Sequence, residues 1–168
     1  MNRKTPSLGG RRRAARIAAV QALYQMALNG GTAEDIIREF IAYRLRGEEG
    51  TASGEPAVDI DLFADVVSGA AAREAEIDGA IANALDKDRQ FGRLEILMRS
   101  ILRAGAYELM GRDDIDPALT ISEYIAVADA FYNEREPALV NAVLDRIARS
   151  LGRAGAKADP AHGLAQDG

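Results

Sequence analysis

Apolar residues recur along most of this chain at spacings of three and four, the period of an α-helix that buries one face. The first such stretch begins at about residue 10 and ends at two consecutive glycines, Gly30 and Gly31. A second helix is predicted from Thr32, whose hydroxyl can cap its first turn, to about residue 45. The apolar stripes of these two helices consist of Ile17, Val20, Tyr24, Ala27 and Leu28 in the first, and Ile37, Phe40, Ile41 and Leu45 in the second.

The same period returns twice after a glycine-rich loop. Residues 59–85 predict one long helix or two in succession, with Gly69 and Gly79 as weak points. Residues 94–109 carry a broad apolar face and predict another helix, in which Gly105 would let a neighbouring helix approach closely.

Two more helices complete the pattern. Asp116 and the following proline start a new segment, and Thr120 with Glu123 has the spacing of a capping box ahead of the first of these helices. Asn133 with Glu136 repeats that spacing ahead of the last helix. The last stripe is the most regular in the chain and consists of Leu139, Val140, Val143, Leu144, Ile147, Ala148 and Leu151.

No run alternates long enough to predict a strand, so the expected fold is all-α. Residues 10–151 are predicted to form one domain of six to seven helices, arranged as two small packed bundles. The N-terminal bundle would span about residues 10–85 and the C-terminal bundle about residues 91–151. Residues 1–9 are expected to form a flexible basic arm, and residues 152–168 a disordered tail.

The composition excludes most catalytic chemistry. The 168 residues include no cysteine, which removes disulfides, thiolate nucleophiles and cysteine zinc sites. The only histidine, His162, falls in the predicted tail, so imidazole acid–base catalysis lacks its residue. Asp113, Asp114 and Asp116 crowd one loop without the spacing of an EF-hand. The chain is therefore predicted to be no enzyme and to hold neither a metal nor a cofactor.

The location expected from the sequence is the cytoplasm. No stretch approaches the roughly 18 uncharged apolar residues of a membrane span, so no membrane association is predicted. The N-terminus is basic but lacks the apolar run of a secretory signal.

The charge is strongly divided along the chain. Residues 1–16 carry +6 and contain no acid, whereas the whole chain has a formal charge of −5, so the other 152 residues carry −11. Guanidinium groups bind phosphates through paired hydrogen bonds, and a basic segment on an acidic body is typical of a protein that meets a polyanion. The pattern therefore predicts a nucleic-acid contact. The alternatives are a solvated helix end and a basic segment that folds back on the acidic body.

Two other residues of the first helix could contact bases. Tyr24 could stack on an unpaired base. It also lies within the apolar stripe, however, so a core tyrosine with its hydroxyl at the edge is the favoured interpretation. Gln21 lies on the polar side, where it could reach base edges, although glutamine is common on exposed helices.

Three blocks of sequence resemble the NusB family of bacterial transcription antitermination factors. RRRAAR at residues 11–16, followed by AVQALY at 19–24, resembles the N-terminal signature of that family. ILRAGAYEL at 101–109 is similar to its central helix, and LVNAVLDRIAR at 139–149 is similar to its C-terminal helix. The blocks follow one another in the family's order, and the resemblance covers about residues 10–151.

The resemblance implies an all-helical, non-enzymatic protein of two bundles that binds the boxA element of ribosomal RNA leader transcripts. It also implies pairing with NusE, a ribosomal protein of the small subunit, within an RNA polymerase complex that resists termination. By position, the implied RNA-binding residues are Arg11, Arg12, Arg13, Arg16, Gln21, Tyr24 and Asn141. Further contacts are expected from Arg3, Lys4, Arg135, Arg146 and Arg149.

The chain departs from the family pattern near Asn141. Leu139 stands where the family has Phe, Ala142 where it has Gly, and Ser122 where it has Asn. These changes alter the second surface implied to contact RNA, on the last helix.

Two other functions are consistent with such a chain. One is an accessory domain that delivers RNA to an enzyme, like the NusB-type region of ribosomal RNA cytosine methyltransferases. Those proteins carry a separate catalytic domain with a cysteine nucleophile, which this chain lacks. The other is a self-associating helical protein, and the sequence leaves a homodimer open because buried and exposed apolar faces look alike in it.

Overall fold

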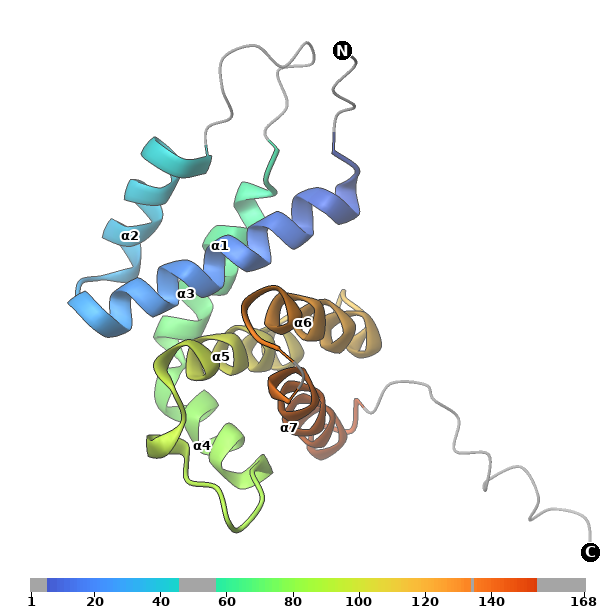
Figure 1. Cartoon of the computed structure of the whole chain (residues 1–168). Helices are drawn as coiled ribbons and strands as arrows, with labels where there is room; N and C mark the ends of the chain where they lie inside the picture. The colour runs from blue at the N-terminus through green and yellow to red at the C-terminus, as the bar shows by residue number, and fades with distance from the viewer. Residues whose placement is uncertain (1–5, 46–56, 134, 154–168) are drawn as a thin grey trace, which may run out of the picture.

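The structure is a computed structural model that describes residues 6–45, 57–133 and 135–153. Every regular element in these ranges is helical (Figure 1), which confirms the all-α prediction. A π-helical turn (Ile41–Leu45) extends the second helix, and a short 3₁₀ turn (Phe91–Arg93) precedes the fifth. The seven α-helices are α1 (Leu8–Asn29), α2 (Ala33–Phe40), α3 (Ile60–Ala72), α4 (Glu74–Ala84), α5 (Ile96–Gly111), α6 (Pro117–Phe131) and α7 (Glu136–Ser150).

The first helix begins earlier than the sequence predicted. The hydroxyl of Ser7 accepts a hydrogen bond from the N–H of Gly10 at 3.1 Å, so the helix starts at Leu8, inside the predicted arm. Arg3 and Lys4 lie outside the described residues. The predicted cap of α2 is confirmed, because the hydroxyl of Thr32 accepts from the N–H of Asp35 at 3.1 Å.

The chain breaks between α3 and α4 at Arg73, not at either predicted glycine. Gly69 lies within α3 and lets the ring of Tyr107 approach, since a Cβ there would lie 2.1 Å from the ring. Gly105 has the predicted role, because a Cβ there would lie 2.7 Å from a methyl group of Leu144 on α7. Both glycines therefore permit close helix packing.

The core gathers around α5, which contacts α1, α3, α4, α6 and α7. In Figure 1, α1 crosses α3, and α6 and α7 lie together on one side. The fourth helix packs on α5 and α7 more extensively than on α3, its neighbour in sequence. The two-bundle division near residue 85 stays a prediction, because α5 joins helices of both halves.

Both predicted capping boxes are wrong. The carboxylate of Asp116 caps α6 by accepting from the N–H of Ala118, so Thr120 lies inside the helix and is buried. Among the described residues, no side chain caps the start of α7, and Asn133 precedes it outside the helix. In α6 the carboxylate of Glu123 is consequently available for a partner on another helix.

The ordered chain continues past the predicted domain end. Gly152, at φ +69°, and the N–H of Arg153, which donates to the carbonyl of Ala148, complete a Schellman turn after α7. The Arg153 guanidinium donates to the carbonyl of Leu109 near the end of α5 and to the carbonyl of Ile115 in the segment that follows it. These two residues of the predicted disordered tail are therefore fixed, whereas residues 154–168 lie outside the described part.

We expect stability to fall with pH at the alkaline end because of Tyr107. Burial and a hydrogen bond to Asp65, at 2.8 Å, raise the pKa of Tyr107 to about 12. A raised pKa means that the folded state holds the phenol proton more tightly than the unfolded chain does, so this contribution is complete below pH ~10 and lost between pH ~10 and 12. Urea unfolding at pH 8 and pH 11 should show a smaller pH-dependent loss for Tyr107→Phe than for the parent. An equal loss in both proteins would contradict the assignment.

Candidate nucleic-acid interface

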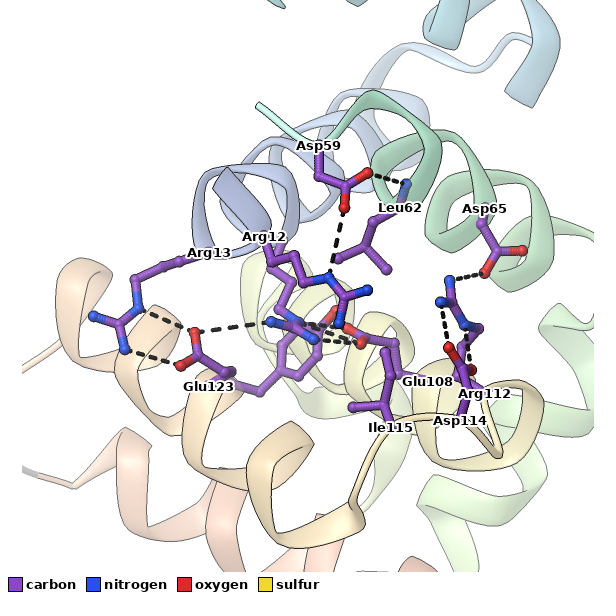
Figure 2. A network of polar contacts seen from close by, with 12 residues as sticks. Arg12, Arg13, Asp59, Leu62, Asp65, Glu108, Arg112, Asp114, Ile115 and Glu123 are labelled. Atoms are coloured by element: carbon purple, nitrogen blue, oxygen red, sulfur yellow. Dashed lines mark hydrogen bonds and ion pairs between the residues drawn. The ribbon is translucent and has the colours of Figure 1, made fainter. Parts of the chain in front are cut away.

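The predicted arginine cluster, Arg11, Arg12, Arg13 and Arg16, occupies the first turns of α1. Three of these arginines meet carboxylates from other helices or their caps. Arg12 meets Asp59 and Arg13 meets Glu123 (Figure 2), and Arg16 meets Glu108. The basic segment therefore folds back on acidic residues, which was one of the alternatives left open by the sequence.

Arg16 is buried, with 1% of its surface exposed. Its Nε and Nη2 donate to the two carboxylate oxygens of Glu108 at 2.9 Å each, and the hydroxyl of Tyr124 donates to the same carboxylate. Burial lowers the pKa of Arg16, but the hydrogen bonds and charge of Glu108 outweigh it and raise that pKa above its ordinary value. Only 2% of the Arg16 side chain is exposed, so the structure gives no support to the prediction that this residue contacts RNA. The guanidinium joins α1 to α5 instead.

Arg13 is the most open of the three paired arginines, with 54% of its side chain exposed. Its Nε and Nη2 donate to the two oxygens of Glu123 on α6, at 3.0 Å each (Figure 2). Hydrogen bonding to Glu123 raises the pKa of Arg13. The carboxylate of Glu123 is only 13% exposed and also lies 3.9 Å from Nη1 of Arg16.

Arg12, on α1, extends its side chain to the start of α3. Its side chain is 31% exposed, and its Nε lies 3.5 Å from Oδ2 of Asp59 without forming a hydrogen bond. Asp59 has other roles, since its Oδ1 caps α3 at the N–H of Leu62 and its own N–H donates to the carbonyl of Arg11. Arg11 itself is half-buried. The first turns of α1 and the cap of α3 are thus joined through both backbone and side chains.

A second polar cluster lies beside Arg12 (Figure 2). Arg112 pairs with Asp114 at 2.8 Å and with Asp65 at 3.2 Å. Hydrogen bonding to Arg112 lowers the pKa of Asp114 to about 2, and the charge of Arg12 contributes to that lowering. The positive charges of Arg12 and Arg112 therefore both lie beside carboxylates.

Gln21 and Tyr24 lie further along α1, and both are exposed. The core interpretation of Tyr24 is wrong, because 37% of its surface is accessible. The buried face of α1 is rotated from the predicted stripe, because burial along this helix does not follow side-chain size. The buried face consists largely of small residues, which let α1 pack closely: Ala15, Ala18, Ala19, Val20, Ala22 and Leu23.

The predicted RNA-contacting residues on and beside α7 differ in what their side chains contact. Asn141 is exposed, and so is Arg135 at the start of the helix. Arg146 donates to the carbonyl of Ala84 at 2.7 Å and thereby holds the end of α4. Arg149 is exposed and pairs within α7. Of these four, only Arg146 is held by another helix through a contact described by the structure.

The carboxylates of this site were missed at the sequence level. One signal was available for Glu108, which lies between two apolar residues in the most buried helix, where an acid needs a partner. Nothing comparable marks Asp59, and Glu123 has the spacing of a capping box with Thr120. Among the described residues, no group of acids and histidines could hold a metal ion, and no helix has the length and apolarity to cross a bilayer.

The family model for NusB matches residues 13–149, which include Arg13 and Arg16 of the arginine cluster and all or most of each helix from α1 to α7. The chain belongs to the NusB family. That membership bears out the resemblance seen in three sequence blocks, and it places the chain among transcription antitermination proteins rather than enzymes.

Curated NusB proteins match along most of their length. The transcription antitermination protein NusB of Sinorhizobium fredii is 44% identical over 140 residues, which cover 83% of this chain and 87% of that protein. NusB of Brucella ovis is 42% identical over 163 residues, which cover 95% of each chain.

Solved NusB structures share the fold. T. maritima NusB superposes with a TM-score of 0.67 at 29% identity, covering 87% of this chain and 92% of that chain. A chain from the crystal structure of antitermination factors NusB and NusE in complex with dsRNA gives a TM-score of 0.66 at 22% identity, covering 82% and 96%. At that identity the second match shows the fold alone.

Proposed function

We propose that this chain is an RNA-binding antitermination factor that acts on ribosomal RNA operons by binding boxA RNA together with NusE, as part of an RNA polymerase complex. The observation that carries the proposal is the placement of Arg13, more than half exposed and held at the surface by α6. Its guanidinium has five N–H donors and gives one from Nε and one from Nη2 to Glu123, so three remain. A guanidinium at the surface with three remaining N–H donors can donate hydrogen bonds to an RNA phosphate.

The exposed residues further along α1 suit bases. From Arg13 to Tyr24 is eleven residues, or about 16 Å along the helix at 1.5 Å per residue. Single-stranded RNA is read through stacked, unpaired bases as well as its backbone, and Tyr24 offers an exposed ring for stacking. Arg12 and Arg13 would supply the phosphate contacts, with Arg11 beside them, and Gln21 and Asn141 would be polar contacts. The expected partners follow from family membership and from a NusB–NusE–dsRNA structure of the same fold.

Replacing Arg12 and Arg13 together with Ala should weaken RNA binding by about tenfold, since hydrogen bonds to charged groups contribute most per contact. The dependence of log affinity on log salt should also become shallower, by up to about 1.4 if both contacts on a single strand are lost. Fluorescence anisotropy across a salt series measures both quantities.

The matched control is the double variant Arg38→Ala and Arg73→Ala. It removes the same charge from arginines that also pair with carboxylates, on α2 and at the α3–α4 junction. We expect it to bind RNA nearly as the parent does. If both double variants weaken binding equally, the effect is one of net charge and the site is misplaced.

Specificity is tested with boxA RNA and a scrambled RNA of equal length, each with and without NusE. Tighter binding to boxA that NusE strengthens is the expected result. Equal, weak binding to both RNAs would favour a general polyanion contact. A stable oligomer without RNA preference, measured by light scattering, would favour the self-associating alternative.

A further inference from the structure

We propose that Glu123 competes with RNA phosphate for Arg13 and thereby sets the RNA affinity of this site. The inference rests on the proposed function, because it takes Arg13 as a phosphate contact. It assigns an opposing role to a carboxylate on α6, a helix that the sequence did not connect with the arginine cluster.

The first step is the charge of the folded site. The three arginines whose partners are described carry +3, and the carboxylates of Asp59, Glu108 and Glu123 carry −3. These three pairs therefore have no net charge, although residues 1–16 alone carry +6. A phosphate approaching them meets arginines that already hold anions.

The second step separates Glu123 from the other two carboxylates. Glu108 is fully buried and its Arg16 is out of reach of a ligand. Asp59 caps α3, so it is retained for the fold. Of these three pairs, only that of Arg13 and Glu123 combines an arginine open to solvent with a carboxylate that serves no cap.

The third step is the geometry of the pair. The two oxygens of Glu123 accept from Nε and Nη2 of Arg13 in the paired, planar arrangement that two phosphate oxygens also adopt. A phosphate that binds this Nε–Nη2 edge must displace Glu123, whereas one that binds the three remaining N–H donors still meets the negative charge of the neighbouring carboxylate. On release, Glu123 does not lose all compensation, since Nη1 of Arg16 lies 3.9 Å away. This second cation, Arg16, lowers the free-energy cost of releasing Glu123 from Arg13 when a phosphate binds.

The test uses two variants of Glu123. Glu123→Gln removes the competing charge, so RNA affinity should rise by about twofold to fivefold, the range expected for an ion pair of which one partner is open to solvent. Its salt dependence should become steeper, because the site gains one net positive charge. Glu123→Asp keeps the charge beside Arg16 but is shorter by one methylene, so it should release Arg13 and also raise affinity, without steepening the salt dependence.

The matched control is Glu76→Gln. Glu76 accepts from Nε and Nη2 of Arg73 at 2.9 and 3.0 Å, the same paired geometry at the α3–α4 junction. We expect RNA binding of this control to equal that of the parent. An equal rise in Glu76→Gln and Glu123→Gln would overturn the inference in favour of a net-charge effect.

Failure of the inference and failure of the proposed function give different results. If Arg13→Ala weakens binding while Glu123→Gln binds no better than the parent, the RNA site stands and Glu123 positions Arg13 instead of competing for it. If Glu123→Asp binds as the parent does, Glu123 acts only through its charge, and competition is overturned. If Arg13→Ala binds RNA as the parent does, the proposed site itself fails. Circular dichroism and urea midpoints confirm that the variants compared are folded.

Discussion

Glu108→Gln is expected to destabilise the folded protein by about 3–5 kcal/mol, because removing one partner of a buried ion pair leaves the other charge uncompensated. Arg16 is 1% exposed, and Glu108 accepts hydrogen bonds from Arg16 and from Tyr124. The nearest other carboxylate, Glu123, lies 3.9 Å from Arg16 and is already held by Arg13. The neutral amide of Gln has one acceptor oxygen where the carboxylate has two, and it cannot balance the charge of the guanidinium.

Urea unfolding followed by circular dichroism measures this effect as a lower midpoint at an unchanged slope. Glu34→Gln is the matched control, since Glu34 pairs with Arg38 on α2 and its side chain is 83% exposed. We expect that control to change stability by less than about 0.5 kcal/mol. Equal effects of the two substitutions would show that the buried pair contributes no more than an exposed one.

A double replacement separates the pair from its parts. Arg16→Met with Glu108→Leu removes both charges together and should be far less destabilising than Glu108→Gln, because no isolated charge stays buried. A double variant as unstable as the single one would mean that packing around Arg16, and not its charge, dominates.

Gly69→Ala is the second substitution with a large expected effect, a loss of about 1–3 kcal/mol through overpacking. The added Cβ would lie 2.1 Å from the ring of Tyr107, and that ring is held in place because its hydroxyl donates to Asp65. Alanine favours a helix over glycine by up to about 1 kcal/mol, and the loss is expected in spite of that gain.

Gly79→Ala provides the control within the same pair of helices. Gly79 lies inside α4, and a Cβ there would meet no atom within 4 Å. The same substitution should therefore stabilise the protein by about 0.5–1 kcal/mol. If close packing decides the outcome, thermal and urea unfolding should show a loss of stability for Gly69→Ala and a gain for Gly79→Ala. A stabilising Gly69→Ala would show that α3 and α5 can separate at little cost.

The helices of this protein could be predicted because their signals are local. The apolar period of 3.6, the Thr32 cap and the Gly30-Gly31 stop all act within a few residues of the chain. Local signals also misled, since Thr120 with Glu123 has the spacing of a capping box and yet Asp116 begins the helix. A cap at Asp116, about one turn before Thr120, changes where the helix begins but not that it forms.

The candidate site could be predicted only in part. The arginines were visible as a run, and the resemblance to NusB indicated their role, which stays a proposal for Arg11, Arg12, Arg13, Gln21, Tyr24 and Asn141. The alanine-rich buried face of α1 was not recognised, because alanine is equally common on exposed helices. The wrong interpretation of Tyr24 as a core residue has the same cause.

The sequence by itself determined an all-helical chain with its positive charge concentrated at the start of the first helix, because helical period and charge are properties of neighbouring residues. Only the tertiary structure decided what each arginine does. Arg16 meets an acid 92 positions away and Arg13 meets one 110 positions away, and no spacing along the chain encodes such pairs. They form because α1 packs against α5 and α6, and that packing buries one guanidinium while it leaves the other at the surface.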